Sequence, residues 1–130
     1  MKVLLVDDHA LFAKSLSIAL CDFPEIEQFS STKDIQHLEE LIAGELPDIL
    51  LIDINLGGLT DEDGLMLTKH LLEHFPEQKI VILSGYNLPV YRKEAKRIGA
   101  KGFISKDVEP DELLHILLMV NDGATHFPRE

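Results

Sequence analysis

The sequence predicts an α/β fold in which helices cover both faces of a doubly wound, five-stranded parallel sheet. Four short apolar runs are each followed at once by polar residues. Continuous rather than alternating hydrophobicity is typical of strands that are covered on both sides. Segments of helical periodicity lie between these runs, so the chain alternates strand and helix five times. This alternation favours right-handed crossovers and parallel strand pairing.

The expected strands differ in how apolar they are. They are Val3–Val6, Ile26–Ser30, Ile49–Ile52, Ile80–Leu83 and Gly102–Ile104. The second and the fifth are short or polar, as edge strands can be. The strand order 2-1-3-4-5 of flavodoxin-like sheets places both of them at the edges. In such a sheet, ligands bind beyond the carboxyl ends of the strands, where the winding reverses between strands one and three.

The expected helices alternate with these strands. They are Leu11–Leu20, Thr32–Ala43, Gly64–Phe75, Leu88–Ile98 and Pro110–Val120. Pro110 suits a first helical turn because the amide hydrogen that proline lacks would have no partner there, and Gly123 suits a helix stop. We therefore expect one domain over residues 1–122, followed by a tail or the start of a linker over residues 123–130.

Composition limits the classes of partner. The 130 residues include 12 Lys and Arg and 23 Asp and Glu, so the net charge is −11. A chain this acidic repels phosphate backbones and anionic lipid headgroups, so we expect no direct contact with nucleic acid or membranes. No apolar run approaches the length of about 18 residues that a membrane span requires. The single Cys21 cannot form an internal disulfide, which favours a reducing, cytoplasmic location.

Polar residues stand where the expected strands end: Asp7, Asp8, Asp53, Ser84 and Lys106. The carboxyl ends of parallel strands meet at one edge of the sheet, so these side chains should converge. Three carboxylates within about 5 Å of one another would repel by about 3 kcal/mol per pair at an effective dielectric near 20, so the cluster requires a cation. Oxygen ligands favour a hard ion, and Mg²⁺ fits best because it binds through one or two carboxylates plus a phosphate.

The same cluster predicts phosphoryl chemistry. A carboxylate beside a metal ion and a lysine can attack phosphorus and form an aspartyl-phosphate while the cations neutralise the transferring oxygens. Asp53, at the end of the central strand, is the nucleophile that we choose. Asp7 and Asp8 suit a metal-holding pair, and Lys106 supplies a second positive charge.

Over residues 2 to 122, the chain resembles the receiver domain of bacterial two-component response regulators. Four segments carry the resemblance: Val6-Asp7-Asp8, Leu50-Leu51-Ile52-Asp53, Leu83-Ser84-Gly85 and Lys101-Gly102-Phe103-Ile104-Ser105-Lys106. The resemblance assigns Mg²⁺ to Asp7, Asp8, Asp53 and the backbone carbonyl of Asn55. It assigns phosphorylation to Asp53, a phosphoryl contact to Ser84 and charge pairing to Lys106.

The resemblance also implies partners and a switch. The phosphoryl group would come from the phosphohistidine of a sensor kinase or from a small acyl phosphate. Ser84 would move toward the phosphoryl group and the ring of Phe103 would turn inward, although simple core filling also explains Phe103. The last residues resemble regulators with a LuxR-type helix-turn-helix output domain. The expected output is therefore transcription regulation, and a homodimer is the expected signalling form. The expected catalysis is limited to self-phosphorylation and autodephosphorylation.

Two features depart from the family pattern. The family usually places Asp-Gly eight residues after its phospho-acceptor, whereas Gly57-Gly58-Leu59-Thr60-Asp61-Glu62 delays Asp63-Gly64 to eleven here. The expected loop is therefore longer, which can alter metal access or kinase docking. Asp107 follows Lys106 where many members have proline, so a cis peptide bond is not expected there.

Two other functions remain open at this stage. A phosphatase of the haloacid-dehalogenase type also uses an aspartate nucleophile, but it requires a second aspartate two residues later, where this chain has Asn55. A phosphate-independent interaction module could keep the acidic pocket without using it.

Further features suggest surfaces or ligands. Arg92, Lys93, Lys96 and Arg97 should form a solvent-facing basic strip, either simply solvated or in contact with a partner. The segment Leu113–Val120 is apolar on nearly every side, so we expect an exposed patch that self-associates or docks an output domain, with a mostly buried helix as the alternative. His70 and His74 have a spacing compatible with zinc, but no third ligand is evident. His9 is expected only to cap or orient the first helix.

Overall fold

The fold is a single parallel sheet between two layers of helices. The computed structural model describes residues 1–56, 64–85 and 89–127. Its strands are β1 (Lys2–Val6), β2 (Gln28–Thr32), β3 (Ile49–Asp53), β4 (Lys79–Ser84) and β5 (Gly102–Ser105). Its helices are α1 (Ala10–Leu20), α2 (Leu38–Glu45), α3 (Gly64–His74), α4 (Pro89–Ile98) and α5 (Pro110–Asn121). The order β2-β1-β3-β4-β5, with every pair parallel, confirms the predicted topology.

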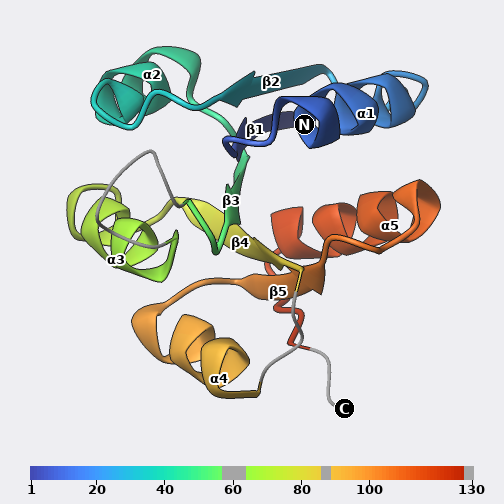
Figure 1. Ribbon diagram of the computed structural model, residues 1–130. Helices are drawn as coiled ribbons and strands as arrows, with labels where there is room; N and C mark the ends of the chain where they lie inside the picture. The colour runs from blue at the N-terminus through green and yellow to red at the C-terminus, as the bar shows by residue number, and fades with distance from the viewer. Residues whose placement is uncertain (57–63, 86–88, 128–130) are drawn as a thin grey trace.

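The sheet separates two hydrophobic cores. Helices α1 and α5 cover one face, and α2, α3 and α4 cover the other (Figure 1). Every residue of β3 is buried, as the continuous apolar runs predict. Leu51 faces the α1/α5 core and its neighbours Leu50 and Ile52 face the opposite core, so alternate residues of one strand supply both cores.

The second strand and second helix start later than predicted. Strand β2 begins at Gln28 rather than Ile26, and α2 begins at Leu38 rather than Thr32. The reason is a turn in between: the amide of Asp34 donates to Thr32 Oγ1 at 3.0 Å, and the amide of His37 donates to Asp34 Oδ1 at 3.2 Å. Such side-chain bonds give the backbone an alternative to helix hydrogen bonding, so the helix cannot begin until the turn is complete.

The exposed apolar patch expected on the last helix is absent from the described structure, and that prediction is wrong. The members of α5 that pack in the core are Leu113, Leu114, Ile116, Leu117 and Val120. Leu118 and Met119 are half-buried. The helix lies against both the sheet and α1, which is why its apolar residues extend round so much of its circumference.

The described part of the expected tail packs against the sheet. The amide of His126 donates to the carbonyl of Lys101, and the amide of Phe103 donates to the carbonyl of His126, both at 2.9 Å. Phe127 packs against the α2–α4 core, and the ammonium of Lys96 lies 5.9 Å from the centre of its ring. The segment therefore covers the outer edge of β5.

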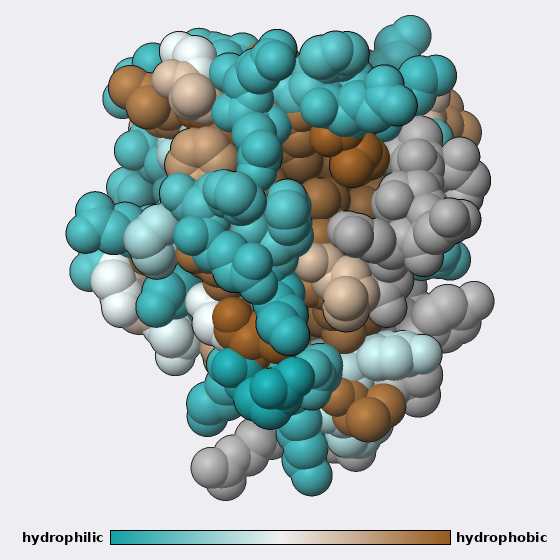
Figure 2. Space-filling view, turned by 90° about the vertical axis from the view of Figure 1, so that its left-hand side faces the viewer, coloured by the Kyte–Doolittle hydropathy of each residue, from teal (hydrophilic) through white to brown (hydrophobic). Residues whose placement is uncertain are grey.

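On α4 the expected basic strip is largely present. Lys93, Lys96 and Arg97 are exposed, whereas Arg92 is half-buried. Arg97 is ion-paired with Glu94 of the same helix. Figure 2 looks onto the side that carries α2, α3 and α4, where hydrophilic residues cover most of the described surface and hydrophobic side chains show between them. Within the described residues, no helix has both the length and the apolar character needed to cross a bilayer.

Candidate functional site

The strand ends bring the predicted polar residues to one rim of the sheet. Asp53 is the last residue of β3 and Ser84 the last of β4, while Asp7 and Lys106 follow β1 and β5. Backbone bonds fix these ends: the amide of Ile54 donates to the carbonyl of Leu83 at 2.8 Å, and the amide of Lys106 donates to the carbonyl of Ser84 at 2.9 Å. The ladder thus sets the spacing of the side chains that follow it.

Lys106 connects two carboxylates. Its ammonium donates to Asp53 Oδ2 at 2.9 Å and to Asp7 Oδ2 at 3.0 Å. The side chains of Asp7 and Asp53 are 0% and 3% exposed, so the lysine compensates charge that water cannot reach. The Lys106 ammonium also lies 4.6 Å from the centre of the Phe12 ring on α1. This contact helps to hold the lysine over the rim.

Sequence reasoning missed the place of His9 in this cluster. His9 Nδ1 lies 2.8 Å from Asp7 Oδ1, 3.3 Å from Asp8 Oδ1 and 3.2 Å from Asp53 Oδ2. The hydrogen bond with Asp7 raises the pKa of His9 above its ordinary value. His9 stands at the predicted N-cap position of α1, where its carbonyl accepts from the amide of Ala13 at 3.0 Å, but its side chain makes no cap hydrogen bond. The only sequence signal was its position directly after the acidic pair.

The acidic residues fit a hard divalent cation. Among the described residues, the buried oxygen Asp8 Oδ1 has no hydrogen-bond partner, and the ligand atoms of Asp7, Asp8, His9 and Asp53 all lie within 4.8 Å of one another. An unpaired buried carboxylate oxygen is costly unless a cation or donor meets it. Asp7 and Asp8 line a surface cavity of about 420 Å³, and carboxylates beside such a space suit Mg²⁺, which keeps several waters. The backbone amide of Asn55 donates to Asp53 Oδ1 at 3.1 Å, so Asn55 also orients the central carboxylate.

Burial and pairing act in opposite directions on the two buried acids. Burial is the largest influence on Asp53 and raises its pKa, against the lowering effect of Lys106. Burial also acts to raise the pKa of Asp7, but hydrogen bonds from the His9 amide and from Lys106 together outweigh it and leave that pKa below its ordinary value. Asp7 therefore holds its charge more firmly than Asp53 does.

Gly64 was missed as a residue on which the site depends. A Cβ atom at this position would lie 2.2 Å from the carbonyl oxygen of Asp53 and 2.7 Å from the Cα atom of Ile54. The Gly64 amide donates to the Ile54 carbonyl at 2.8 Å, and its own carbonyl accepts a bond from Thr68 Oγ1 at 2.7 Å. Helix α3 therefore begins in direct contact with the end of β3. The sequence signal was the pair Asp63-Gly64, which predicted the length of the loop but not this close contact.

Two predicted switch residues are buried. Ser84 is 1% exposed at the rim, and Phe103 is 2% exposed within the α2–α4 core. Phe103 thus already faces inward and fills the core, which was the alternative to a switching role that the sequence left open. The predicted loop extension, Gly57–Asp63, lies outside the described residues. The Lys106–Asp107 peptide bond is trans, because no cis peptide bond occurs in the described chain.

The comparison with protein families decides the identity. The response regulator receiver domain family matches residues 3–118, which is most of the chain. The chain belongs to this family. It is a receiver domain of two-component response regulators, and the family is not one of catalytic enzymes.

Similar proteins agree with this assignment. The oxygen regulatory protein NreC of Staphylococcus haemolyticus is 32% identical over 97% of this chain and 57% of its own length. The transcriptional regulatory protein DegU of Brevibacillus brevis is 27% identical over 97% of this chain and 52% of its own length. The receiver domain therefore spans little more than half the length of these curated relatives.

Solved structures share the fold. The receiver domain of the putative response regulator NarL from Mycobacterium tuberculosis is 26% identical with a TM-score of 0.79, over 94% of this chain and 96% of that one. The non-phosphorylated receiver domain of RcsB from Escherichia coli has a TM-score of 0.88 at 22% identity, over 99% of this chain and 98% of that one.

Proposed function

We propose that this receiver domain is a phosphorylation-dependent switch that accepts a phosphoryl group on Asp53. The observation that carries the proposal is the paired contact of Lys106 with Asp53 and Asp7, at 2.9 and 3.0 Å, beside Asp8 Oδ1, which has no hydrogen-bond partner among the described residues. In this proposal Asp53 is the nucleophile, Lys106 is a fixed cation, and Asp7 and Asp8 are the metal-binding pair. Family membership favours the switch over a phosphatase of the haloacid-dehalogenase type, and Asn55 stands where that enzyme needs its second aspartate.

In the proposed reaction, a carboxylate oxygen of Asp53 attacks the phosphorus of the donor. The new P–O bond forms as the donor's P–N or P–O bond breaks, and the leaving group departs with its electron pair. Asp7, Asp8, Asp53 and the carbonyl of Asn55 would hold Mg²⁺, which supplies neutralisation of the transferring oxygens. Lys106, released from Asp53 as that oxygen becomes esterified, pairs with a phosphoryl oxygen, and the Ser84 hydroxyl donates to another.

Burial of Asp53 has two effects on this chemistry. A carboxylate whose pKa is raised by burial is poorly solvated, so less water must be displaced before it attacks. Lys106 and the amide of Asn55 hold its two oxygens in place and so reduce the orientational cost. Later hydrolysis of the aspartyl-phosphate returns the domain to its starting state, so its catalysis is limited to its own modification.

Mass spectrometry after incubation with acetyl phosphate and Mg²⁺ tests the proposal. The native chain should gain one phosphoryl group, and Asp53→Asn should gain none. Asp8→Asn should gain it far more slowly at the same Mg²⁺ concentration, because the metal-holding pair is incomplete. A folded native chain that is not modified would refute the proposal and leave a phosphate-independent interaction module.

We further propose that a sensor histidine kinase is the natural donor and that the output is transcription regulation, in the cytoplasm, through an attached DNA-binding domain beyond residues 1–122. Support comes from the names of the relatives, a transcriptional regulatory protein and an oxygen regulatory protein, both nearly twice as long as this chain. The net charge of −11 supports an output through another domain rather than direct DNA contact. Sedimentation with and without beryllofluoride tests whether the switch acts by homodimerisation.

A further inference from the structure

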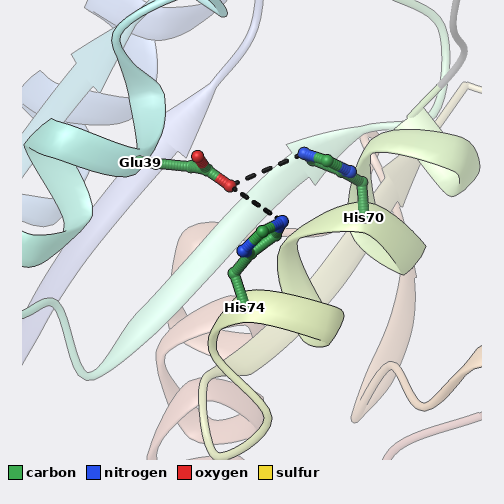
Figure 3. A group of neighbouring side chains, drawn as sticks. All are labelled: Glu39, His70 and His74. Atoms are coloured by element: carbon green, nitrogen blue, oxygen red, sulfur yellow. Dashed lines mark ion pairs between the residues drawn. The ribbon is translucent and has the colours of Figure 1, made fainter.

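A second cluster of metal-binding side chains lies between α2 and α3, apart from the phosphorylation site. Glu39 Oε1 lies 3.5 Å from His70 Nε2 and 3.6 Å from His74 Nε2. The two histidines stand one turn apart on α3, and Glu39 reaches toward both of them from α2 (Figure 3). The carboxylate is the third ligand that the sequence did not reveal, because it belongs to the preceding helix.

The distances between the three ligand atoms of this cluster match those of ligands around a shared ion better than those of hydrogen bonds. Both nitrogen–oxygen distances exceed the normal range for a hydrogen bond. Ligands at about 2.0 to 2.1 Å from a tetrahedral ion lie about 3.3 Å from one another, close to the distances observed. The three ligand atoms all lie within 4.8 Å of one another, so small side-chain movements would complete the site.

The central oxygen, Glu39 Oε1, has no hydrogen-bond partner among the described residues, although it lies within ion-pair distance of both imidazoles. Glu39 Oε1 is shielded from solvent without any hydrogen bond, although its side chain as a whole is 46% exposed. The two imidazole rings whose nitrogens lie nearest to it have centres 4.9 Å apart. A shielded carboxylate oxygen that faces two imidazole nitrogens beyond hydrogen-bond distance is a place where a cation can replace the missing donors.

We propose that Glu39, His70 and His74 bind a transition-metal ion of the Zn²⁺ class. Imidazole nitrogens select Zn²⁺ and its neighbours over Mg²⁺, whereas the oxygen-rich cluster at the strand ends has the opposite preference. Two histidines and one glutamate leave a fourth position for water. The side chains of His70, His74 and Glu39 are 52%, 53% and 46% exposed, so water can reach an ion held between them.

A bound ion would fasten two helices that the sequence separates by a whole strand. Helix α3 begins at Gly64, which touches the backbone of Asp53, so the clamp holds the element that follows the proposed phosphorylation site. Binding to the folded chain and not to the unfolded one raises the melting temperature.

The test is a Zn²⁺ titration of the whole chain in saturating Mg²⁺, which occupies the strand-end acids. Competition with a chromophoric chelator should give one ion per chain, and Zn²⁺ should raise the melting temperature. Since loss of a residue that merely supports a metal ligand costs about 10- to 100-fold in affinity, His70→Ala, His74→Ala and Glu39→Gln should each cost at least as much. Each variant should fold normally without Zn²⁺, as judged by circular dichroism and its metal-free melting temperature.

Matched controls separate this site from other Zn²⁺ ligands. His37 is an exposed histidine that contacts one carboxylate at 2.8 Å and belongs to no group of three ligands within the described part of the chain, so His37→Ala should bind Zn²⁺ as the native chain does. His9→Ala should also leave the Zn²⁺ affinity unchanged, because His9 belongs to the strand-end cluster and not to the proposed Zn²⁺ site. Unchanged affinity in folded His70→Ala and His74→Ala, or loss only in His9→Ala, overturns the proposal.

Co²⁺ provides a spectroscopic readout of the ligands. A site of two imidazoles and a carboxylate should give visible ligand-field bands that disappear in His74→Ala. The bands should be free of thiolate charge transfer, because the exposed Cys21 lies on a different helix end and takes no part. A charge-transfer band that vanishes in Cys21→Ser would assign the ion to the thiol and contradict the proposal.

Discussion

Replacement of Gly64 by alanine should destabilise the domain because the added methyl group meets backbone. The new Cβ would lie 2.2 Å from the carbonyl oxygen of Asp53 and 2.9 Å from its carbonyl carbon. Real Cβ atoms essentially never approach another atom within 3.0 Å, so the end of β3 and the start of α3 must separate by about 1 Å. A side chain could rotate away from such a contact, but a backbone that is hydrogen-bonded on both sides cannot.

The expected cost follows from this overlap. Overpacking in a well-packed region costs about 1 to 3 kcal/mol, and a backbone contact belongs at the upper end of that range. The better helix propensity of alanine returns about 0.5 kcal/mol at a helix terminus. We expect a net loss of about 2 kcal/mol, which corresponds to a fall of roughly 8 °C in melting temperature for a domain of this size.

Urea unfolding of the metal-free protein, followed by circular dichroism, measures this loss. Gly44→Ala is the matched control, because Gly44 lies in α2 and a Cβ there would have no atom within 4 Å. The control should gain about 0.5 kcal/mol from helix propensity alone. Gly64→Ala should also accept phosphate more slowly, since its strain falls on Asp53. If Gly64→Ala is as stable as the native chain, the close approach of α3 to β3 is not as the structure describes.

Three further predictions concern other parts of the molecule. Without Mg²⁺, Lys106→Ala should lose about 2 to 4 kcal/mol in urea unfolding, because two buried carboxylates lose their cation, and Mg²⁺ should restore part of the loss. The hydrogen bond to Asp34 raises the pKa of His37, so NMR titration should show a fall to the ordinary value in Asp34→Asn. The small stabilisation from this pair should be present below pH about 6.5 and lost as the pH rises through the raised pKa. Leu117→Ala in α5 should cost about 2 to 5 kcal/mol and Leu118→Ala less, because only Leu117 is fully buried.

Each of these predictions has an outcome that contradicts it. The control for Lys106→Ala is Lys101→Ala, at an exposed position, which should change the free energy of unfolding by no more than about 0.5 kcal/mol. An equal loss of stability in the Lys101 and Lys106 variants would contradict the pairing of Lys106 with the buried carboxylates. An unchanged His37 pKa in Asp34→Asn would mean that the pair does not form in solution. Equal costs at Leu117 and Leu118 would contradict the burial of one side of α5.

The topology could be predicted because it depends on patterns that are local in the sequence. The apolar run of β3 needs cover on both faces wherever the strand lies, and the polarity of β2 suits an edge position. The polar residues at the strand ends then had to share a rim, since parallel strands place their carboxyl ends together. The meeting of Asp53 with Lys106 follows from this rule alone.

The features that were missed depend on partners that are distant in the sequence. Glu39 reaches His70 only because α2 and α3 lie side by side on one face of the sheet, and no spacing along the chain encodes that contact (Figures 1 and 3). Burial of α5 depends on α1, which lies at the opposite end of the chain. The late start of α2 has a local cause instead. The sequence shows Asp34 as a possible turn residue, but it does not show that the turn is more stable there than the first turn of the helix.

The pairing of His126 with β5 connects the tail to the outer edge of the sheet. The amide of Phe103 is bonded to the tail, while its side chain fills the core beneath α4. A force on a segment after residue 127 would therefore act first on β5, the strand that carries the Phe103 ring. Peeling the tail away would uncover the amide of Phe103 and the carbonyl of Lys101, which are the groups that another extended chain needs in order to dock beside the sheet.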